Sequence, residues 1–280
     1  MTGAVASEPE TRFSKQLRDA TTTDHRDAAG AGFVSALMAS KLPIEAYADL
    51  ASQQWFIYTE LEDAAERHRD DPVARTFVRD ELVRRPVIEE DLRAVLGDDW
   101  ASKVQPLPAT SSYLERLRTA ASDSSVAFVA HHYTRYMGDL SGGQFIGRAI
   151  DRNFGFSGGP GARFYVFDRI DDVDEFKDEY RRALDSAPWS EADREAIIDE
   201  VRVAYRHNQA VISELGEKYT ISGCTEGCDR AGSHPSVASS LRWAGQGSTP
   251  RAAQLTQVCT PGTAASRAAG IGLPQPVQRP

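Results

Sequence analysis

Apolar residues along the first 220 positions recur mostly at three- and four-residue steps, the spacing that places side chains on one face of an α-helix. No segment sustains the strict alternation that is typical of a half-buried strand. The pattern predicts helices over residues 11–29, 43–69, 73–96 (a pair broken near Pro86), 111–121, 124–151, 172–186 and 190–215. It therefore indicates an all-α domain, an irregular helical bundle rather than an up-and-down one.

Residues with preferences for helix ends support several of these boundaries. Pro43 suits a helix start, and the Asp-Asp-Pro run at 70–72 ends that helix, because proline disfavours helical backbone in the residue before it. Ser190 and Asp193 have the spacing of a capping box. The glycine-rich stretch 155–161 predicts the clearest loop of the chain.

The periodic pattern ends near residue 220, where Gly, Ser, Ala, Pro and Gln become dominant. Such a composition cannot bury enough apolar surface to offset the entropy of ordering the chain. We therefore expect a flexible N-terminus over residues 1–9, one folded domain over 10–220, and a disordered tail over 221–280.

Charge and composition limit the classes of partner. The net charge of −9 and the pI of about 5.2 argue against a nucleic-acid surface. No run of 18 apolar residues exists and the first ten residues lack a secretory pattern, so we expect neither a membrane span nor export.

The cysteine distribution points to a reducing compartment. All three cysteines follow residue 220, so the first 220 residues have no disulfide framework, which fits the cytoplasm. Cys224, Cys228 and His234 suggest a metal site in the tail, but their spacing matches no strong zinc pattern. Disorder without metal is the preferred interpretation.

Four glycines interrupt the predicted helix over residues 124–151: Gly138, Gly142, Gly143 and Gly147. Each costs roughly 1 kcal/mol relative to alanine in a helix interior. Gly138 and Gly142 are one turn apart and leave bare backbone on one face, which another helix or a flat molecule could approach closely. Close helix packing explains the glycines alone, but polar residues beside them (Arg135, Asp139 and Ser141) favour a ligand.

The stretch 133–144, YTRYMGDLSGGQ, resembles the distal-helix signature of the haem oxygenase family. The resemblance extends over roughly residues 10–215. It implies an irregular all-α bundle in which haem is held between a proximal and a distal helix. In that family the distal glycines make room for dioxygen at the haem iron, and the aspartate that follows the first glycine holds a water network. Gly138, Gly142 and Asp139 take these positions here.

The resemblance also implies an axial iron ligand. It places that role on His25, the only histidine of the predicted first helix. The family usually has glutamate one turn later, where this chain has Ala29, so another acceptor must orient the imidazole. His131 and His132 are rival ligands. We expect His68 to be solvated and His207, on the last predicted helix, to be structural.

Further residues match family positions that contact haem or its distal water network. Haem carries two propionates, which call for cations at the edge of the site. For each such cation alone, a solvated helix face is the simpler interpretation, and for Tyr58 an ordinary core tyrosine is equally plausible. The residues matched to haem binding are Arg18, Tyr133, Ser141, Lys177, Arg181 and Asn208. The residues matched to catalysis are Tyr58 and Arg135, in addition to Gly138, Asp139 and Gly142.

Asp139 is the candidate for the central chemical role. Through water, a carboxylate beside the haem could deliver and stabilise the proton that dioxygen activation needs. Its alternative is a salt bridge with Arg135 at i, i+4 spacing. Both interpretations can hold, since Arg135 could orient the carboxylate.

The resemblance implies an enzyme that converts haem b, which is both substrate and cofactor, to biliverdin, CO and ferrous iron with O2. The chain has no GxGxxG fingerprint for flavin or NAD. Electrons are therefore expected from an NAD(P)H-dependent flavoprotein reductase or a ferredoxin, docking at the cationic rim of a monomer. The alternatives are a non-catalytic haem carrier or sensor and a thiaminase-like enzyme, the second disfavoured by the lack of cysteine in the domain.

Overall fold

The computed structural model describes residues 12–24 and 32–219, which belong to one compact unit of the chain. Within these residues no strand is present, so the prediction of an all-α domain is confirmed for them. None of the described helices is long and apolar enough to cross a membrane. The α-helices are α1 (Phe13–Ala20), α3 (Gly32–Met38), α4 (Ile44–Arg67), α5 (Arg85–Leu96), α6 (Pro108–Arg116), α7 (Ser125–His132), α8 (Gln144–Phe154), α9 (Val173–Ser186) and α10 (Glu191–Lys218).

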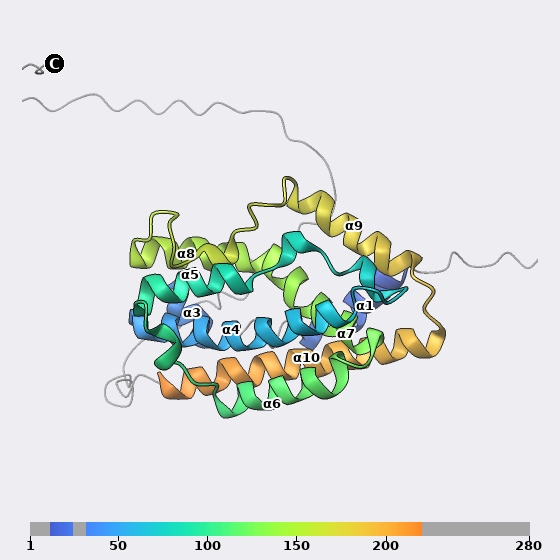
Figure 1. The fold of residues 1–280 in the computed structure, drawn as a ribbon, viewed down its shortest axis with the longest axis horizontal. Coiled ribbons are helices and arrows are strands. Elements are labelled where there is room, and N and C mark those ends of the chain that lie inside the picture. The colour runs from blue at the N-terminus through green and yellow to red at the C-terminus, as the bar shows by residue number, and fades with distance from the viewer. Residues whose placement is uncertain (1–11, 25–31, 220–280) are drawn as a thin grey trace, which may run out of the picture. The chain divides into compact units, whose positions relative to one another are not determined.

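The two longest helices, α4 and α10, form the centre of the bundle (Figure 1). Helix α5 packs against α4, helix α6 packs against both central helices, and α7 lies against both as well. Tyr58 and Leu61 of α4, Phe128 of α7 and Val201 of α10 are fully buried where these helices meet. This core holds rigidly the helices that carry the candidate site.

Local sequence signals explain several helix ends. Pro43 stands at the N-cap of α4, and the side chain of Asp172 caps α9 by accepting hydrogen bonds from the next turn. The capping box that opens α10 is formed as predicted, since Ser190 and Asp193 each bond the other's backbone N–H. These side chains satisfy the free N–H groups that every helix start leaves.

The glycine-bearing run is continuous but is not a uniform α-helix. Helix α7 passes into two π-helical turns, η5 (Tyr133–Met137) and η6 (Asp139–Gly143), and then into α8. Gly138 joins the two turns. A π turn holds an extra residue and bends a helix locally, and the chain visibly changes direction between α7 and α8 (Figure 1). The prediction of an ordinary helix over 124–151 missed this widening.

Other boundaries also differ from prediction. The first part of 73–96 forms two short 3₁₀ turns, η1 (Ala74–Thr76) and η2 (Asp80–Leu82), in place of a full helix. The predicted break near Pro86 is present, since α5 begins at Arg85 with Pro86 in its first turn. The helix expected at 111–121 starts at Pro108 and ends in a third π turn, η4 (Leu117–Ala121). Proline fits the first turn of a helix because a backbone N–H at that position would have no partner within the helix. The remaining 3₁₀ turns are η3 (Trp100–Ser102) and η7 (Arg163–Tyr165).

A buried ionic cluster joins α6, α7 and α10. Glu200, 8% exposed, accepts hydrogen bonds from both the Nε and Nη2 atoms of Arg116, and its Oε1 lies 2.8 Å from Nε2 of His131. The other ring nitrogen of His131 lies 3.3 Å from the Tyr113 hydroxyl. Burial alone would raise the pKa of Glu200, but the hydrogen bonds from His131 and Arg116 outweigh it and lower the pKa to about 2.

This cluster predicts a loss of stability in acid. A carboxyl group with a lower pKa in the folded chain stabilises the fold above its ordinary pKa of 4.5, and this contribution is lost as the pH falls towards 2. We expect Glu200→Gln to lower the free energy of unfolding by about 2 kcal/mol at neutral pH, and the difference from wild type to shrink below pH 4.5. Denaturant unfolding at several pH values measures it. Glu66→Gln, which removes an exposed i, i+3 pair with Arg69, is the control. A difference between Glu200→Gln and wild type that stays constant across pH would contradict the low pKa of Glu200.

Candidate functional site

Gly138 and Gly142 present an open strip of backbone. A Cβ atom added at either glycine would have no described atom within 4 Å outside its own stretch of helix. In contrast, a Cβ at Gly147 would lie 2.4 Å from the Cβ of Tyr165, so that glycine is needed for close packing. The four glycines therefore have two different uses: Gly143 and Gly147 face the Tyr165 side chain, whereas a Cβ at Gly138 or Gly142 would meet no described segment.

Asp139 follows this strip and is hydrogen-bonded to a tyrosine from α4. The Tyr58 hydroxyl, which is fully buried, donates to Oδ2 of Asp139. Phe164 and Tyr136 pack edge-on against the Tyr58 ring, with centroids 5.1 and 5.4 Å away. Tyr58 is thus a core tyrosine and a polar partner at once, which resolves the two interpretations of this residue.

Arg135 lies on the other side of Tyr58. Its Nη1 donates to Oδ1 of Asn208 on α10 at 2.8 Å, and its guanidinium carbon lies 4.9 Å from the centroid of the Tyr58 ring. Arg135 and Asp139 form no ion pair with each other within the described residues, because Arg135 bonds Asn208 and Asp139 bonds Tyr58, so the salt-bridge alternative for Asp139 is not seen. The widened η5 and η6 turns account for this, because i, i+4 side chains no longer stand directly above each other.

The pKa values of both Asp139 and Arg135 are raised by their surroundings. Burial raises the pKa of Asp139, partly offset by the positive charge of Arg135 and the hydrogen bond from Tyr58. Burial also acts to lower the pKa of Arg135, but nearby Tyr58 and Asp139 outweigh it and the pKa is raised. Asp139 is therefore a carboxyl group poised to take up a proton more easily than an exposed one, beside a permanently charged arginine.

A small cavity adjoins this network. It has a volume of about 60 Å³ and is lined by Gln53 and Gln54 of α4, by Arg135 and by Asn208, together with apolar side chains. The Nε atom of Arg135 is buried and has no hydrogen-bond partner among the described residues. A polar cavity of this size can hold water, which is the medium through which Asp139 was predicted to act.

Two of the three cations predicted to face the propionates, Arg18 and Arg181, lie near Tyr133. Burial raises the pKa of the Tyr133 hydroxyl, and the charges of Arg181 and Arg18 act in the opposite direction, so guanidinium groups from α9 and α1 lie near it. Lys177, one turn before Arg181, is mostly buried and pairs with Asp174 at 2.7 Å. It is not the solvated lysine that the simpler interpretation expected. Ser141 lies half-buried in η6.

Two of the predicted positions, His25 and Ala29, lie outside the described residues, as do Cys224, Cys228 and His234 of the tail. Among the described residues no group of three or more His, Cys, Asp and Glu side chains could hold a metal ion. The helix predicted over 11–29 is described only to residue 24, with a break at Thr21.

The remaining histidines have structural partners. His131 is bound in the Glu200 cluster, and Nδ1 of His132 lies 2.9 Å from the Tyr180 hydroxyl. The prediction that His68 is solvated is wrong: it is 6% exposed and its Nε2 lies 2.8 Å from the Ala121 carbonyl. His207 stacks on Tyr113 with ring centroids 4.9 Å apart. These contacts weaken the case for His131 and His132 as rival iron ligands.

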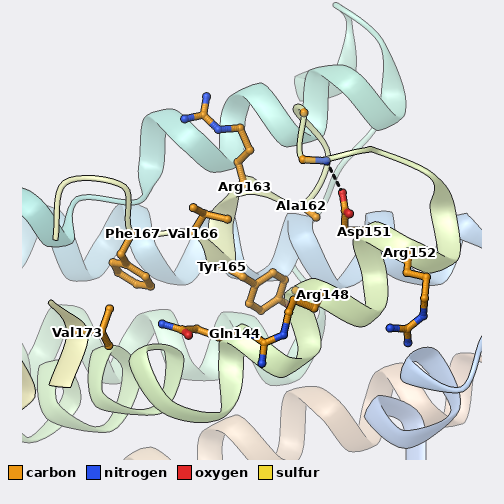
Figure 2. Close-up of a pocket in the computed structure, with 13 residues that line it drawn as sticks. Gln144, Arg148, Asp151, Arg152, Ala162, Arg163, Tyr165, Val166, Phe167 and Val173 are labelled. Carbon is orange, nitrogen blue, oxygen red and sulfur yellow. Dashed lines mark hydrogen bonds between the residues drawn. The ribbon is translucent and has the colours of Figure 1, made fainter. Parts of the chain in front are cut away.

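Sequence reasoning missed Gln54 and Tyr165. Nε2 of Gln54 lies 3.4 Å from the Tyr165 hydroxyl, and its position in an otherwise apolar stripe of α4 was the available signal. Tyr165 also lines a cleft of about 640 Å³ between α8 and the segment around η7 (Figure 2). None of the residues predicted for the site lines this cleft, so we locate the candidate site at the glycine strip and not there.

The described residues fit haem as the molecule that covers the strip. The strip accepts a flat surface because no Cβ is present and no described segment fills it. Arg18, Lys177 and Arg181 are cations of the kind that propionates require, and in this structure Lys177 pairs with Asp174 and Arg181 with Asp178. Asp139 provides a buried polar group beside the same face.

Comparison with known proteins agrees with this geometry. The family model "Heme oxygenase" matches residues 11–214. The chain belongs to the haem oxygenase family. Among curated relatives, "Heme oxygenase" of Rhodella violacea is 35% identical over 210 residues, covering 75% of this chain and 89% of that protein.

Solved haem oxygenase structures show the same fold. Heme oxygenase-1 of the cyanobacterium Synechocystis, solved in complex with heme, is 32% identical with a TM-score of 0.70, covering 74% of this chain and 94% of that one. The Leptospira interrogans haem oxygenase is 31% identical with a TM-score of 0.69, covering 73% and 100%. The expected fold class and family are thus both confirmed.

The Tyr58–Asp139 hydrogen bond of this haem oxygenase can be tested in the hemin-free protein. The bond favours the charged carboxylate, so Tyr58→Phe should raise the pKa of Asp139 further. The pH dependence of the Asp139 carboxyl ¹³C chemical shift in the hemin-free protein measures it. Tyr219→Phe, which removes another tyrosine–aspartate bond, to Asp49, should leave Asp139 unchanged. A lower or equal pKa in Tyr58→Phe would contradict the bond.

Proposed function

We propose that this haem oxygenase converts haem to biliverdin, CO and ferrous iron, using three O2 and seven electrons from an external donor. The observation that carries the proposal is the buried Asp139 carboxyl, bonded to Tyr58, directly beside the open Gly138–Gly142 strip. A carrier needs the open strip, but it has no use for a proton-accepting group placed next to it. When bound, haem supplies both the iron that activates O2 and the ring that is oxidised.

The residues of the chain divide the work between holding and protonating. Arg18, Lys177 and Arg181 attract the propionates and set which edge of haem faces outward. Gly138 and Gly142 let the macrocycle approach the helix backbone. In the same proposal His25 ligates the iron from the opposite side, and Ser141 and Tyr133 contact haem.

Asp139 transfers protons through water in this scheme. Burial raises its pKa towards the range where it can both accept and release a proton. The positive charge of Arg135 favours the ionised form of the Asp139 carboxyl. The hydrogen bond from Arg135 to Asn208 fixes the position of the arginine. The cavity beside Arg135 is the route by which water would reach this group.

Electrons reach the haem from a separate protein in this proposal, either an NAD(P)H-dependent flavoprotein reductase or a ferredoxin. The cationic group of Arg18, Lys177 and Arg181 is the face to which such an acidic partner would dock. We further infer a monomer with the catalytic domain within residues 10–220, acting in the cytoplasm, where the placement of the cysteines suggests it. The family membership favours this enzyme over a haem carrier or sensor.

Removing the Asp139 carboxyl should separate binding from cleavage. The cations and His25 remain in Asp139→Ala, so we expect hemin affinity to change less than about threefold. Biliverdin formation driven by ascorbate should fall by about 100-fold, the low end for losing a proton-transfer group. Asp123→Ala, which removes an exposed carboxylate before α7, is the control. Undiminished biliverdin would refute the role of Asp139, and lost hemin binding would indicate a structural role.

The proposed iron ligand can be tested by removal and rescue. His25→Ala should lose the absorption spectrum of histidine-ligated hemin and regain it when imidazole is added, because free imidazole can occupy the same position. His132→Ala is the matched variant, and we expect it to retain the wild-type spectrum. An unchanged spectrum in His25→Ala would reassign the ligand to another histidine.

A further inference from the structure

The 3₁₀ turn η7 is held unusually firmly for a loop. The Asp91 carboxylate accepts hydrogen bonds from the backbone N–H groups of Gly161, Arg163 and Phe164 at 2.6, 3.0 and 2.7 Å. Asp91 is 1% exposed, so this is a buried charge satisfied by three backbone donors.

A buried arginine holds the same turn from its other end. Nη1 of Arg84, also 1% exposed, donates to the carbonyls of Val166 at 2.7 Å and Phe164 at 3.4 Å. Its guanidinium carbon lies 4.2 Å from the centroid of the Phe167 ring. Breaking either charged contact would leave an unpaired buried group, which is costly, so the backbone of η7 is fixed on both sides.

The two aromatic residues of η7 contact the two elements that hold the Tyr58–Asp139 pair. Phe164 packs edge-on against Tyr58 at 5.1 Å. Tyr165 reaches the helix itself: its Cδ1 would lie 3.4 Å from a Cβ at Gly143, and that Cβ position is 3.5 Å from the Cβ of Asp139. Figure 2 shows the Tyr165 ring directed from the η7 segment towards α8, beside Gln144 and Arg148.

The Tyr165 ring has little freedom to move. It is 4% exposed, it packs edge-on against Phe164 at 4.8 Å, and its hydroxyl lies 3.4 Å from Nε2 of Gln54. Gly147 brings the helix so close that a Cβ there would collide with the ring. A ring fixed at both ends therefore stands against the η6 turn that carries Asp139.

We propose that Tyr165 is a positioning residue for Asp139: its ring supports the η6 turn through Gly143 and so sets where the Asp139 carboxyl stands relative to the open glycine strip. The η6 turn departs from ordinary α-helical geometry, so contacts from outside the helix help to define its shape. The proposal rests on the proposed role of Asp139, and it assigns to Asp91 and Arg84 the task of holding the support in place.

The test compares Tyr165→Leu with Tyr165→Phe. Leucine removes the ring edge at Gly143, whereas phenylalanine keeps it and loses only the contact with Gln54. We expect Tyr165→Leu to bind hemin as wild type but to form biliverdin with ascorbate at least about tenfold more slowly, and Tyr165→Phe to retain most of the activity. Trp100→Leu, which removes a buried aromatic ring from η3, controls for general loss of packing and should retain the wild-type rate.

A second readout separates positioning from mere stability. The pH of the acid-to-alkaline spectral transition of bound hemin reports protonation beside the iron. Tyr165→Leu should shift it in the same direction as Asp139→Ala, and the double variant should shift no further than Asp139→Ala alone, because Tyr165 acts through Asp139. If Tyr165→Leu does not fold, Tyr165→Met fills similar volume without a rigid ring and takes its place.

The outcomes distinguish the two proposals. A wild-type protein that forms no biliverdin would overturn the proposed function. An active wild type with unchanged rate and transition in Tyr165→Leu would overturn the positioning role alone. Additive shifts in the double variant would also overturn it, since they would show that Tyr165 acts independently of Asp139.

Discussion

The hydrogen bond from Tyr58 to Asp139 is the interaction on which the site depends. A carboxyl group in this position is withdrawn from water, and burial without a partner would carry a large free-energy cost. The Tyr58 hydroxyl and the nearby charge of Arg135 reduce that cost without neutralising the group through a direct ion pair. The carboxyl thus stays available to exchange a proton, which a tightly paired aspartate would not.

This requirement explains features that on their own would lower stability. Two π turns and a run of glycines weaken the helix from α7 to α8, yet they open one face and keep Arg135 and Asp139 apart. The stability lost there is compensated by rigid surroundings: the ionic cluster of Glu200 anchors α7 to α10, and Asp91 and Arg84 fix η7. A locally weak helix can therefore hold a chemical group in a defined position.

The sequence predicted what local patterns determine. Helical periodicity located most helices, and Ser190 with Asp193 located the start of α10. The motif at 133–144 indicated the family, and the wider resemblance assigned Tyr58, Arg135, Asp139 and Asn208 to one site, where hydrogen bonds join Tyr58 to Asp139 and Arg135 to Asn208.

What it could not predict depends on contacts between distant segments. Helix propensity gives no sign of the π turns, of which η5 contacts α10 and η6 contacts η7, and a pattern read as an ordinary helix leaves an Arg135–Asp139 pair open. The charged neighbours of His68 in sequence predict a solvated side chain, but its ring contacts the carbonyl of Ala121, 53 residues away. The contacts of Asp91 and Arg84 with η7 carry no local signal, since these partners lie 70 or more residues later.

A crystal structure of the protein with hemin bound tests the central claim most directly, because it shows what covers the glycine strip. The account predicts that the hemin plane lies in van der Waals contact with the backbone of Gly138 and Gly142, with the Asp139 carboxyl still bonded to Tyr58 and linked to the iron side through water. Hemin bound away from the strip, or Asp139 ligating the iron directly, would contradict it.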